Sequence, residues 1–176
     1  MNDKKASLEV ITMDEVKLIR RAKCGDREAF ASLYMLYRDR LYRYAYFKLR
    51  SRDDAEDAVS DCVVRVFTAI RGLKSEKAFP AWIFRILYRV CAEMIDSKIK
   101  HAVEVDRADV PIEDSHLSVE LSEALDTLSP DTRDIVLLSV IAGFNSREIS
   151  SLTGTKASTV RSKLSRGLEK MREYLS

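Results

Sequence analysis

The chain has 176 residues, a net charge of +2 and 46% hydrophobic residues, which is enough apolar material for a core and excludes wholesale disorder. Its five glycines and three prolines are too few to separate many short strands, so the composition favours helices. No apolar stretch approaches the roughly 20 residues that span a bilayer, and we find no targeting signal.

The cysteines and histidines do not form a metal-binding pattern. Cys24, Cys62 and Cys91 are far apart and none belongs to a Cys-x-x-Cys pair, whereas His101 and His116 fall in a polar connector. We therefore expect no metal and no cofactor. We expect the three cysteines to be small apolar core residues of a protein from a reducing compartment.

Charge is distributed unevenly along the chain. Residues 1–100 carry 21 Lys and Arg against 15 Asp and Glu, residues 101–130 carry one against eight, and residues 131–176 carry eight against five. Two basic blocks therefore flank an acidic joint. Residues 101–116 of this joint contain a proline and lack helical periodicity, so they are predicted to be a linker. We predict an all-α protein with two small helical domains, residues 1–100 and 117–176.

Helical periodicity predicts four or five helices in the first block. Gly25 suits a C-cap at the end of the first helix, and a break at Arg38–Asp39 is expected within the second. Trp82, in the last helix, is expected to pack in the core. The expected ranges are residues 13–24, 26–50, 51–70 and 78–100.

The third of these ranges contains "DDAEDAVSDCVVRVF", with five carboxylates between residues 53 and 61. Ser51 and Asp54 fit a capping box, and the helix dipole favours carboxylates in the first turns. Neither argument accounts for Asp61, which lies beyond the reach of the dipole. The spacing places Asp54, Asp57 and Asp61 on one face. The opposite, core-facing stripe is predicted to consist of Ala55, Val59, Cys62, Val66 and Ile70.

Four interpretations of these carboxylates are open: a metal site, an acid–base pair, a solvated helix end and a docking surface for a positively charged partner. A metal or acid–base site would need histidines or further carboxylates converging from elsewhere, and the sequence offers no such companions. It also lacks a nucleophile motif and a phosphate-binding glycine loop, so an enzyme is not expected. The docking surface is the interpretation that explains Asp61.

The second block ends in a helix-turn-helix pattern. "LSPDTRDIVLLSVIAG" begins with Ser129 as N-cap and Pro130 at the first helical position, and a short helix, a glycine-containing turn and a longer helix follow. The longer helix has cationic and hydroxyl residues on its outer side, which suit either solvent or the major groove of DNA. The lead-in Gly143–Phe144–Asn145 favours DNA. The residues of the longer helix that face the core are predicted to be Val160, Leu164, Leu168, Met171 and Leu175.

Taken together, the two blocks resemble bacterial sigma factors of the extracytoplasmic-function group, group IV of the sigma-70 family. In the first block the resemblance rests on "AFASLYMLYRDRLYRYAYFKL", "DDAEDAVSDCVVRVF" and "FPAWIFRIL". In the second it rests on "LSPDTRDIVLLSVIAGFNSREISSLTGTKASTVRSKLSRGLEKMREYL". The order and spacing of these segments, and the linker between them, carry the resemblance.

The resemblance implies three binding surfaces. The acidic helix resembles the one that docks on the clamp helices of the RNA polymerase β′ subunit, through Asp54, Glu56, Asp57, Asp61, Val64 and Phe67. The segment from about residue 71 to 100 resembles the part that captures and opens the −10 promoter element, and its candidate contacts are Lys74, Lys77, Arg85, Arg89, Lys98 and Lys100. The helix-turn-helix resembles the reader of the −35 element, with candidates Lys156, Ser158, Thr159, Arg161, Ser162 and Arg166.

The implied function is that of an alternative sigma factor, which binds core RNA polymerase and directs it to promoters. The implied partners are core polymerase, through its β′ clamp helices and β flap, promoter DNA and an anti-sigma factor, with no small-molecule substrate. The implied location is the cytoplasm, with attachment to the membrane only through the anti-sigma factor. Within the family pattern, Glu93 and Asp96 are departures near the end of the first block.

Two other functions compete with this one. A stand-alone helix-turn-helix regulator with a helical N-terminal domain explains the second block but leaves the acidic face unexplained, and such regulators usually dimerise. A helical adaptor that binds only protein predicts no salt-dependent binding to DNA.

Overall fold

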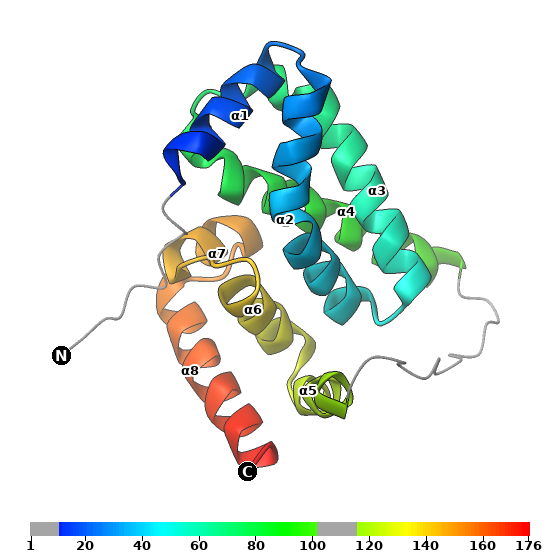
Figure 1. Ribbon diagram of the computed structural model, residues 1–176. Coiled ribbons are helices and arrows are strands. Elements are labelled where there is room, and N and C mark those ends of the chain that lie inside the picture. The colour runs from blue at the N-terminus through cyan, green and yellow to red at the C-terminus, as the bar shows by residue number, and fades with distance from the viewer. Residues whose placement is uncertain (1–10, 102–115) are drawn as a thin grey trace. The chain divides into compact units, whose positions relative to one another are not determined.

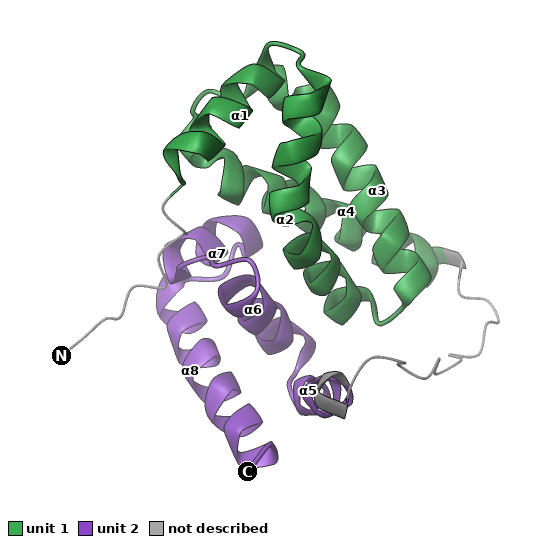
Figure 2. Cartoon of the chain, viewed as in Figure 1, with its two compact units in different colours: residues 1–102 green, residues 103–176 purple. Residues whose placement is uncertain are grey.

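The computed structural model describes residues 11–101 and 116–176, which contain eight α-helices, two 3₁₀ segments and no strand (Figure 1). The predicted all-α class is confirmed. The chain divides into two units, residues 1–102 and 103–176 (Figure 2), and residues 102–115 of the predicted linker lie outside the described residues. Unit 1 contains α1 Met13–Lys23, α2 Arg27–Leu49, α3 Arg52–Ala69, η1 Ile70–Gly72, η2 Glu76–Ala78 and α4 Phe79–His101. Unit 2 contains α5 His116–Asp126, α6 Pro130–Val140, α7 Ser146–Thr153 and α8 Ala157–Tyr174.

The predicted glycine turn forms at the end of α1, but the C-cap residue is Cys24, and Gly25 follows it with a φ of 93°, which favours glycine. Its N–H donates to the carbonyl of Ala22 at 2.9 Å. The next residue, Asp26, caps α2 by accepting a hydrogen bond from the N–H of Ala29 at 3.0 Å. The predicted break at Arg38–Asp39 was wrong: α2 is continuous, and these two exposed side chains form an ion pair at 3.2 Å on its surface.

The core of unit 1 lies between α2, α3 and α4. All five residues of the predicted α3 stripe are buried, which confirms that prediction. Edge-to-face aromatic pairs join α2 to α4, with ring centroids 5.3 Å apart for Tyr37 and Phe79 and 6.1 Å apart for Tyr44 and Phe84. Trp82, expected in the core, is only half-buried.

Two expectations about cysteines and histidines were wrong. Cys24 is exposed at the C-cap of α1, because the helix ends there, whereas Cys62 and Cys91 are buried as expected. His101 and His116 are the end residues of α4 and α5 rather than connector residues. Within the described ranges, no helix combines the length and hydropathy needed to cross a membrane.

Unit 2 forms around the contact of α6 with α8. Ser129 is the N-cap of α6 and Pro130 its first residue, as predicted, but the Ser129 hydroxyl donates to Thr132 Oγ1 at 2.9 Å instead of capping the backbone. The predicted α8 stripe was partly wrong, because Leu168 and Leu175 are 38% and 47% exposed. The buried residues of α8 are Val160, Gly167 and Met171.

Gly167 explains why Leu168 does not belong to the buried stripe. A Cβ atom placed on Gly167 would lie 2.8 Å from Thr132 Cγ2 and 3.1 Å from Val136 Cγ2. The absence of a side chain therefore lets α8 approach α6 closely. Leu168, the next residue along α8, is turned toward solvent as a result.

Candidate functional site

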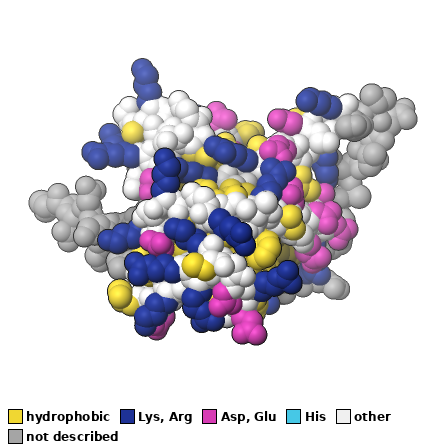
Figure 3. Space-filling model, turned by 90° about the horizontal axis from the view of Figure 1, so that it is seen from above, with side chains coloured by type: hydrophobic (Ala, Val, Ile, Leu, Met, Phe, Trp, Pro, Cys, Tyr) yellow, Lys and Arg dark blue, Asp and Glu magenta, His cyan; other side chains and the backbone are white. Residues whose placement is uncertain are grey.

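The predicted acidic surface lies on the side of α3 opposite its buried stripe. We call its six predicted residues the docking face: Asp54, Glu56, Asp57, Asp61, Val64 and Phe67. Val64 is 64% exposed and Phe67 is 45% exposed, so two apolar side chains follow the carboxylates along the helix. Acidic side chains gather most densely at the right edge of the view in Figure 3, whereas Lys and Arg are spread across it.

The start of α3 explains only part of this charge. Ser51 Oγ accepts a hydrogen bond from the N–H of Asp54 at 3.2 Å, which confirms the predicted N-cap. The Asp54 carboxylate forms an ion pair with Lys98 of α4, and its side chain is only 16% exposed. Asp54 is therefore less accessible than the helical pattern predicts.

The carboxylates of the docking face differ in their partners. Asp54 and Asp61 are ion-paired within unit 1, whereas Glu56 and Asp57 are exposed and form no hydrogen bond or ion pair with another described residue. Because Lys98 is a predicted −10 contact, the Asp54 pair also joins two surfaces that were predicted separately. Glu56 and Asp57 are thus the carboxylates of this face that are exposed and that no described residue compensates.

Arg65 is a residue of this surface that the sequence analysis missed. It lies four residues after Asp61, a spacing at which helical ion pairs form, and it also reaches Glu93 on α4. Its hydrogen bonds hold the pKa of Glu93 below its usual value and raise the pKa of Arg65 itself. The Asp61–Arg65 spacing was the signal in the sequence, but the role of Glu93 depends on the packing of α3 against α4.

The end of the docking face borders a shallow hollow. The Phe67 ring meets that of Phe30 edge-on, with centroids 5.0 Å apart. Phe67 is therefore held in place by α2 while half of it remains exposed. The hollow beside it is lined by Ala22, Gly25, Arg27, Phe67, Thr68 and Arg71.

The six predicted −10 residues do not form one cluster. Lys74 and Lys77 are exposed near η2, at the start of α4, whereas Lys98 and Lys100 are at its far end. A helix rises about 1.5 Å per residue, so about 30 Å of helix separates the two ends. Arg85 and Arg89 lie between them, one half-buried and the other exposed.

The six predicted −35 residues are all exposed, and they extend from the N-cap residue Lys156 to Arg166, near the middle of α8. The preceding helix, α7, begins with a capping box: Asn145 Oδ1 accepts from the N–H of Glu148 at 3.1 Å, and the Glu148 carboxylate accepts from the N–H of Asn145 at 2.9 Å. Gly154, with a φ of 73°, then forms the turn into α8. This is the predicted helix-turn-helix. A shallow hollow on α8 is lined by Arg161, Ser162, Ser165 and Arg166.

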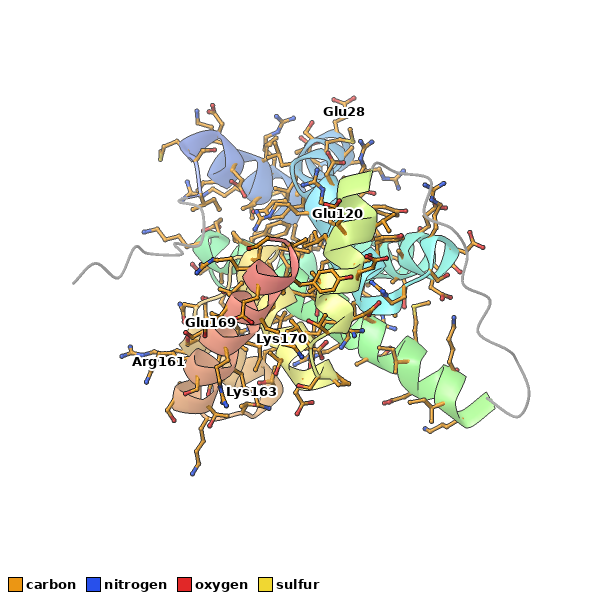
Figure 4. The ribbon with its side chains drawn as sticks, turned by 90° about the horizontal axis from the view of Figure 1, so that it is seen from below. Glu28, Glu120, Arg161, Lys163, Glu169 and Lys170 are labelled. Carbon is orange, nitrogen blue, oxygen red and sulfur yellow. The ribbon has the colours of Figure 1, made fainter. Side chains whose placement is uncertain are left out.

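Three polar contacts fix one side of α8 against α5, α6 and the turn between them. Lys163 pairs with Asp131 at 3.3 Å, Lys170 donates to the carbonyl of Thr127, and the Tyr174 hydroxyl donates to Glu123 at 3.0 Å. In Figure 4, the Arg161 side chain points away from the other helices of unit 2, whereas Lys163 and Lys170 lie on the side of α8 that faces those helices. The cations of α8 therefore divide into an outward set and a set engaged within the unit.

The described residues contain no group of three or more His, Cys, Asp or Glu side chains arranged to hold a metal ion. Burial, with a smaller contribution from nearby Cys91, raises the pKa of the Cys62 thiol to about 12. This thiol is therefore protonated at neutral pH and is a packing residue rather than a nucleophile.

Two family descriptions match the chain. Sigma-70 region 2 matches residues 33–99, and sigma-70 region 4 matches residues 118–171. The first match includes the docking face, and the second includes the helix-turn-helix.

Among curated relatives, the ECF RNA polymerase sigma factor SigE of Mycolicibacterium smegmatis is 34% identical over 167 residues. The alignment covers 86% of this chain and 65% of the relative, so the chain spans slightly less than two thirds of that protein's length. The ECF RNA polymerase sigma factor SigW of Bacillus subtilis is 25% identical over 178 residues, covering 90% of this chain and 95% of the relative.

Two solved structures have the same fold. CnrH, in complex with the cytosolic domain of CnrY, aligns with a TM-score of 0.68 at 21% identity, covering 92% of this chain and 97% of that one. The sigma factor RpoE of Bartonella quintana, in complex with the anti-sigma factor NepR, aligns with a TM-score of 0.67 at 24% identity, covering 83% of this chain and 96% of that one.

Proposed function

Because the chain belongs to the sigma-70 family, in the extracytoplasmic-function group, we propose that it binds core RNA polymerase and directs promoter-specific initiation of transcription. The observation that carries this proposal is the pairing of two surfaces in one chain. An exposed acidic face lies in the region 2 segment, and a cationic, hydroxyl-rich recognition helix lies in the region 4 segment. A stand-alone regulator needs only the second surface.

In this role the docking face binds the clamp helices of the polymerase β′ subunit. Complementary charge across such an interface steers encounter and fixes orientation, and its contribution to affinity is smaller. Asp57, with its exposed and uncompensated carboxylate, is the residue on which we place the largest electrostatic contribution. Val64 and Phe67 supply apolar contact at the end of the face.

The second unit reads the −35 element and meets the β flap. Helix-turn-helix proteins contact base edges with the N-terminal residues of their second helix, and the six predicted −35 residues extend from the N-cap of α8 to its middle. Arg161 and Arg166 suit guanine edges or phosphates, and Ser158, Thr159 and Ser162 permit close approach. Lys163 contributes less, because its ammonium group is engaged by Asp131.

The −10 element is assigned to η2 and α4. Lys74 and Lys77 lie in the segment that would meet an unstacked base, while Arg85, Arg89, Lys98 and Lys100 are spread along α4 as phosphate contacts. Lys98 can contact a phosphate only when its ion pair with Asp54 breaks, so its contribution to DNA binding depends on whether Asp54 is engaged by the polymerase.

An anti-sigma factor is the expected regulatory partner, since the sigma factor RpoE of Bartonella quintana, which has the same fold, forms a complex with the anti-sigma factor NepR. The chain would then act in the cytoplasm and reach the membrane only through that partner. A true anti-sigma factor must compete with core polymerase for the chain. A protein that binds the chain and leaves polymerase binding unchanged would contradict this assignment.

No catalytic group, cofactor, metal or small-molecule substrate of the chain's own is required, because core polymerase supplies the chemistry.

The test of the proposed function is a reconstituted transcription reaction with core polymerase and a library of promoter sequences. We expect transcripts only when the chain is present, from templates that share paired −10 and −35 elements. Sequence-specific DNA binding without polymerase, and no chain-dependent transcripts, would support the stand-alone regulator instead.

A further inference from the structure

Arg65 makes four hydrogen bonds that join the docking face to α4. Its Nε donates to Asp61 Oδ1 at 3.0 Å and its Nη2 to Asp61 Oδ2 at 2.9 Å. On the other side, Nη1 donates to Glu93 Oε1 at 3.1 Å and Nη2 to Glu93 Oε2 at 2.7 Å. One planar guanidinium therefore holds two carboxylates from two helices, each through both of its oxygens.

Asp61 stays accessible in this arrangement. Its side chain is 46% exposed, and a carboxylate has about four lone-pair positions, of which Arg65 uses two. A cationic side chain of a partner protein can therefore reach Asp61 without displacing Arg65.

The net charge of Asp61, Arg65 and Glu93 also affects docking. Arg65 alone would neutralise Asp61, and the neutral pair would no longer attract a positively charged partner. Glu93 supplies a second negative charge from α4, so the three groups together keep a net charge of −1. Asp57, by comparison, keeps its charge, but no other described residue holds its side chain in place through a hydrogen bond or ion pair.

We propose that Arg65 is a positioning residue for polymerase docking, and that Glu93 compensates its charge. Arg65 holds the Asp61 carboxylate in the orientation that the polymerase meets, which reduces the side-chain entropy lost on binding. Glu93 allows this without cancelling the negative field of the docking face. The proposal rests on the proposed function, because it concerns the same contact with core polymerase.

The test is the double variant R65Q/E93Q, which removes the four hydrogen bonds and leaves the net charge of the chain unchanged. Association and dissociation rates with core polymerase are measured for wild type and variant by surface-immobilised kinetics. Because charge steers association and local geometry governs dissociation, we expect an unchanged kon and a koff raised by about two- to fivefold, the size expected for exposed ion pairs. The control variant D14N/K17Q removes an exposed pair of α1, also without changing net charge, and should leave both rates unchanged.

Two single variants separate charge from positioning. E93Q leaves Arg65 uncompensated beside Asp61, so we expect a slower kon and a weaker salt dependence of association. R65K keeps the charge but cannot hold two carboxylates with a planar fork, so we expect a koff close to that of R65Q/E93Q. A purely structural role for Arg65 would lower the folded fraction, which reduces the amplitude of binding and leaves the koff of bound molecules unchanged.

A wild-type koff in R65Q/E93Q would overturn the positioning role while leaving the proposed function in place. A lower koff in that variant would show that Arg65 masks Asp61, and would overturn it as well. If folded wild-type chain does not bind core polymerase at all, the proposed function fails, and the role of Arg65 fails with it.

Discussion

The charged side chains on the docking face of α3 and on the outward side of α8 differ in whether they form ion pairs within their own unit. On α3, two predicted carboxylates, Asp54 and Asp61, are already paired with cations of the same unit. On α8, Arg161 projects away from unit 2, and the cations that do pair, such as Lys163, lie on the inner side of the helix. Carboxylates of the docking face are therefore engaged in ion pairs within unit 1, whereas the outward cation of α8 points into solvent.

This difference predicts which measured quantities a variant of each surface changes. Under the proposed function, removing an outward cation from α8 would delete a contact with DNA, so promoter binding should weaken and its salt dependence should fall. Removing a charge from the α3 network changes both the field of the docking face and the position of its carboxylates. Variants of α3 should therefore show separable effects on kon and koff.

Among the variants that do not reverse a charge, the largest effect is expected for R161A. Loss of an exposed arginine that reaches a base or phosphate should weaken promoter binding by the holoenzyme by about tenfold, with a smaller salt slope. Promoter affinity at several salt concentrations is the measurement. Lys163→Ala is the matched control on the same helix, and it should cost less than about twofold. Equal losses for the two variants would remove the distinction between the outward and inward sets.

The next effect concerns the fold of unit 2. G167A would place a Cβ atom 2.8 Å from Thr132 Cγ2, so we expect overpacking to lower the free energy of unfolding by about 1–2 kcal/mol despite the better helix propensity of Ala. Chemical denaturation measures it. Gly72→Ala is the control, since a Cβ there meets nothing within 4 Å. An equally stable G167A would show that α8 does not need this close approach.

A smaller effect is expected for K98Q. Removing the partner of Asp54 makes the docking face more negative, so association with core polymerase should become about twofold faster at low salt. The association rate as a function of salt checks this. A slower association would mean that Lys98 supports docking rather than competing with the polymerase for Asp54.

The smallest effect is a pH dependence of stability from Glu93. Hydrogen bonds from Arg65 lower the pKa of Glu93 in the folded state from its ordinary value of 4.5. The stabilisation is therefore present above pH 4.5 and is lost as the pH falls through the lowered pKa. The difference in unfolding free energy between wild type and E93Q, measured from pH 7 to pH 3, should shrink over that range. A difference independent of pH would contradict the ion pair.

Much of the fold could be predicted from local signals. The α3 stripe follows from helical spacing. The cap at Ser51, the start of α6 at Ser129–Pro130 and the turns at Gly25 and Gly154 follow from the residue types that those positions favour. The false break in α2 arose because two adjacent charged residues suggest a loop, although both are exposed on a helix that remains buried on its other side.

What the sequence could not supply was contact between helices. Nothing local in α8 indicates that Gly167, rather than Leu168, faces α6. The Asp54–Lys98 pair joins residues 44 positions apart, and Glu93 meets Arg65 across 28 positions. These contacts depend on how α4 packs against α3, and they determine which carboxylates of the docking face remain uncompensated. The assignments of individual residues to polymerase and promoter remain predictions.

The central claim is tested most directly by the affinity of wild type and D57R for core RNA polymerase. Asp57 has no partner among the described residues, so its reversal breaks no internal contact. We expect wild type to bind, D57R to bind about a hundredfold more weakly because like charges meet at the interface, and the control Asp14→Arg to bind as wild type does. Equal binding by wild type and D57R would contradict the docking face, and no binding by folded wild type would contradict the sigma factor function itself.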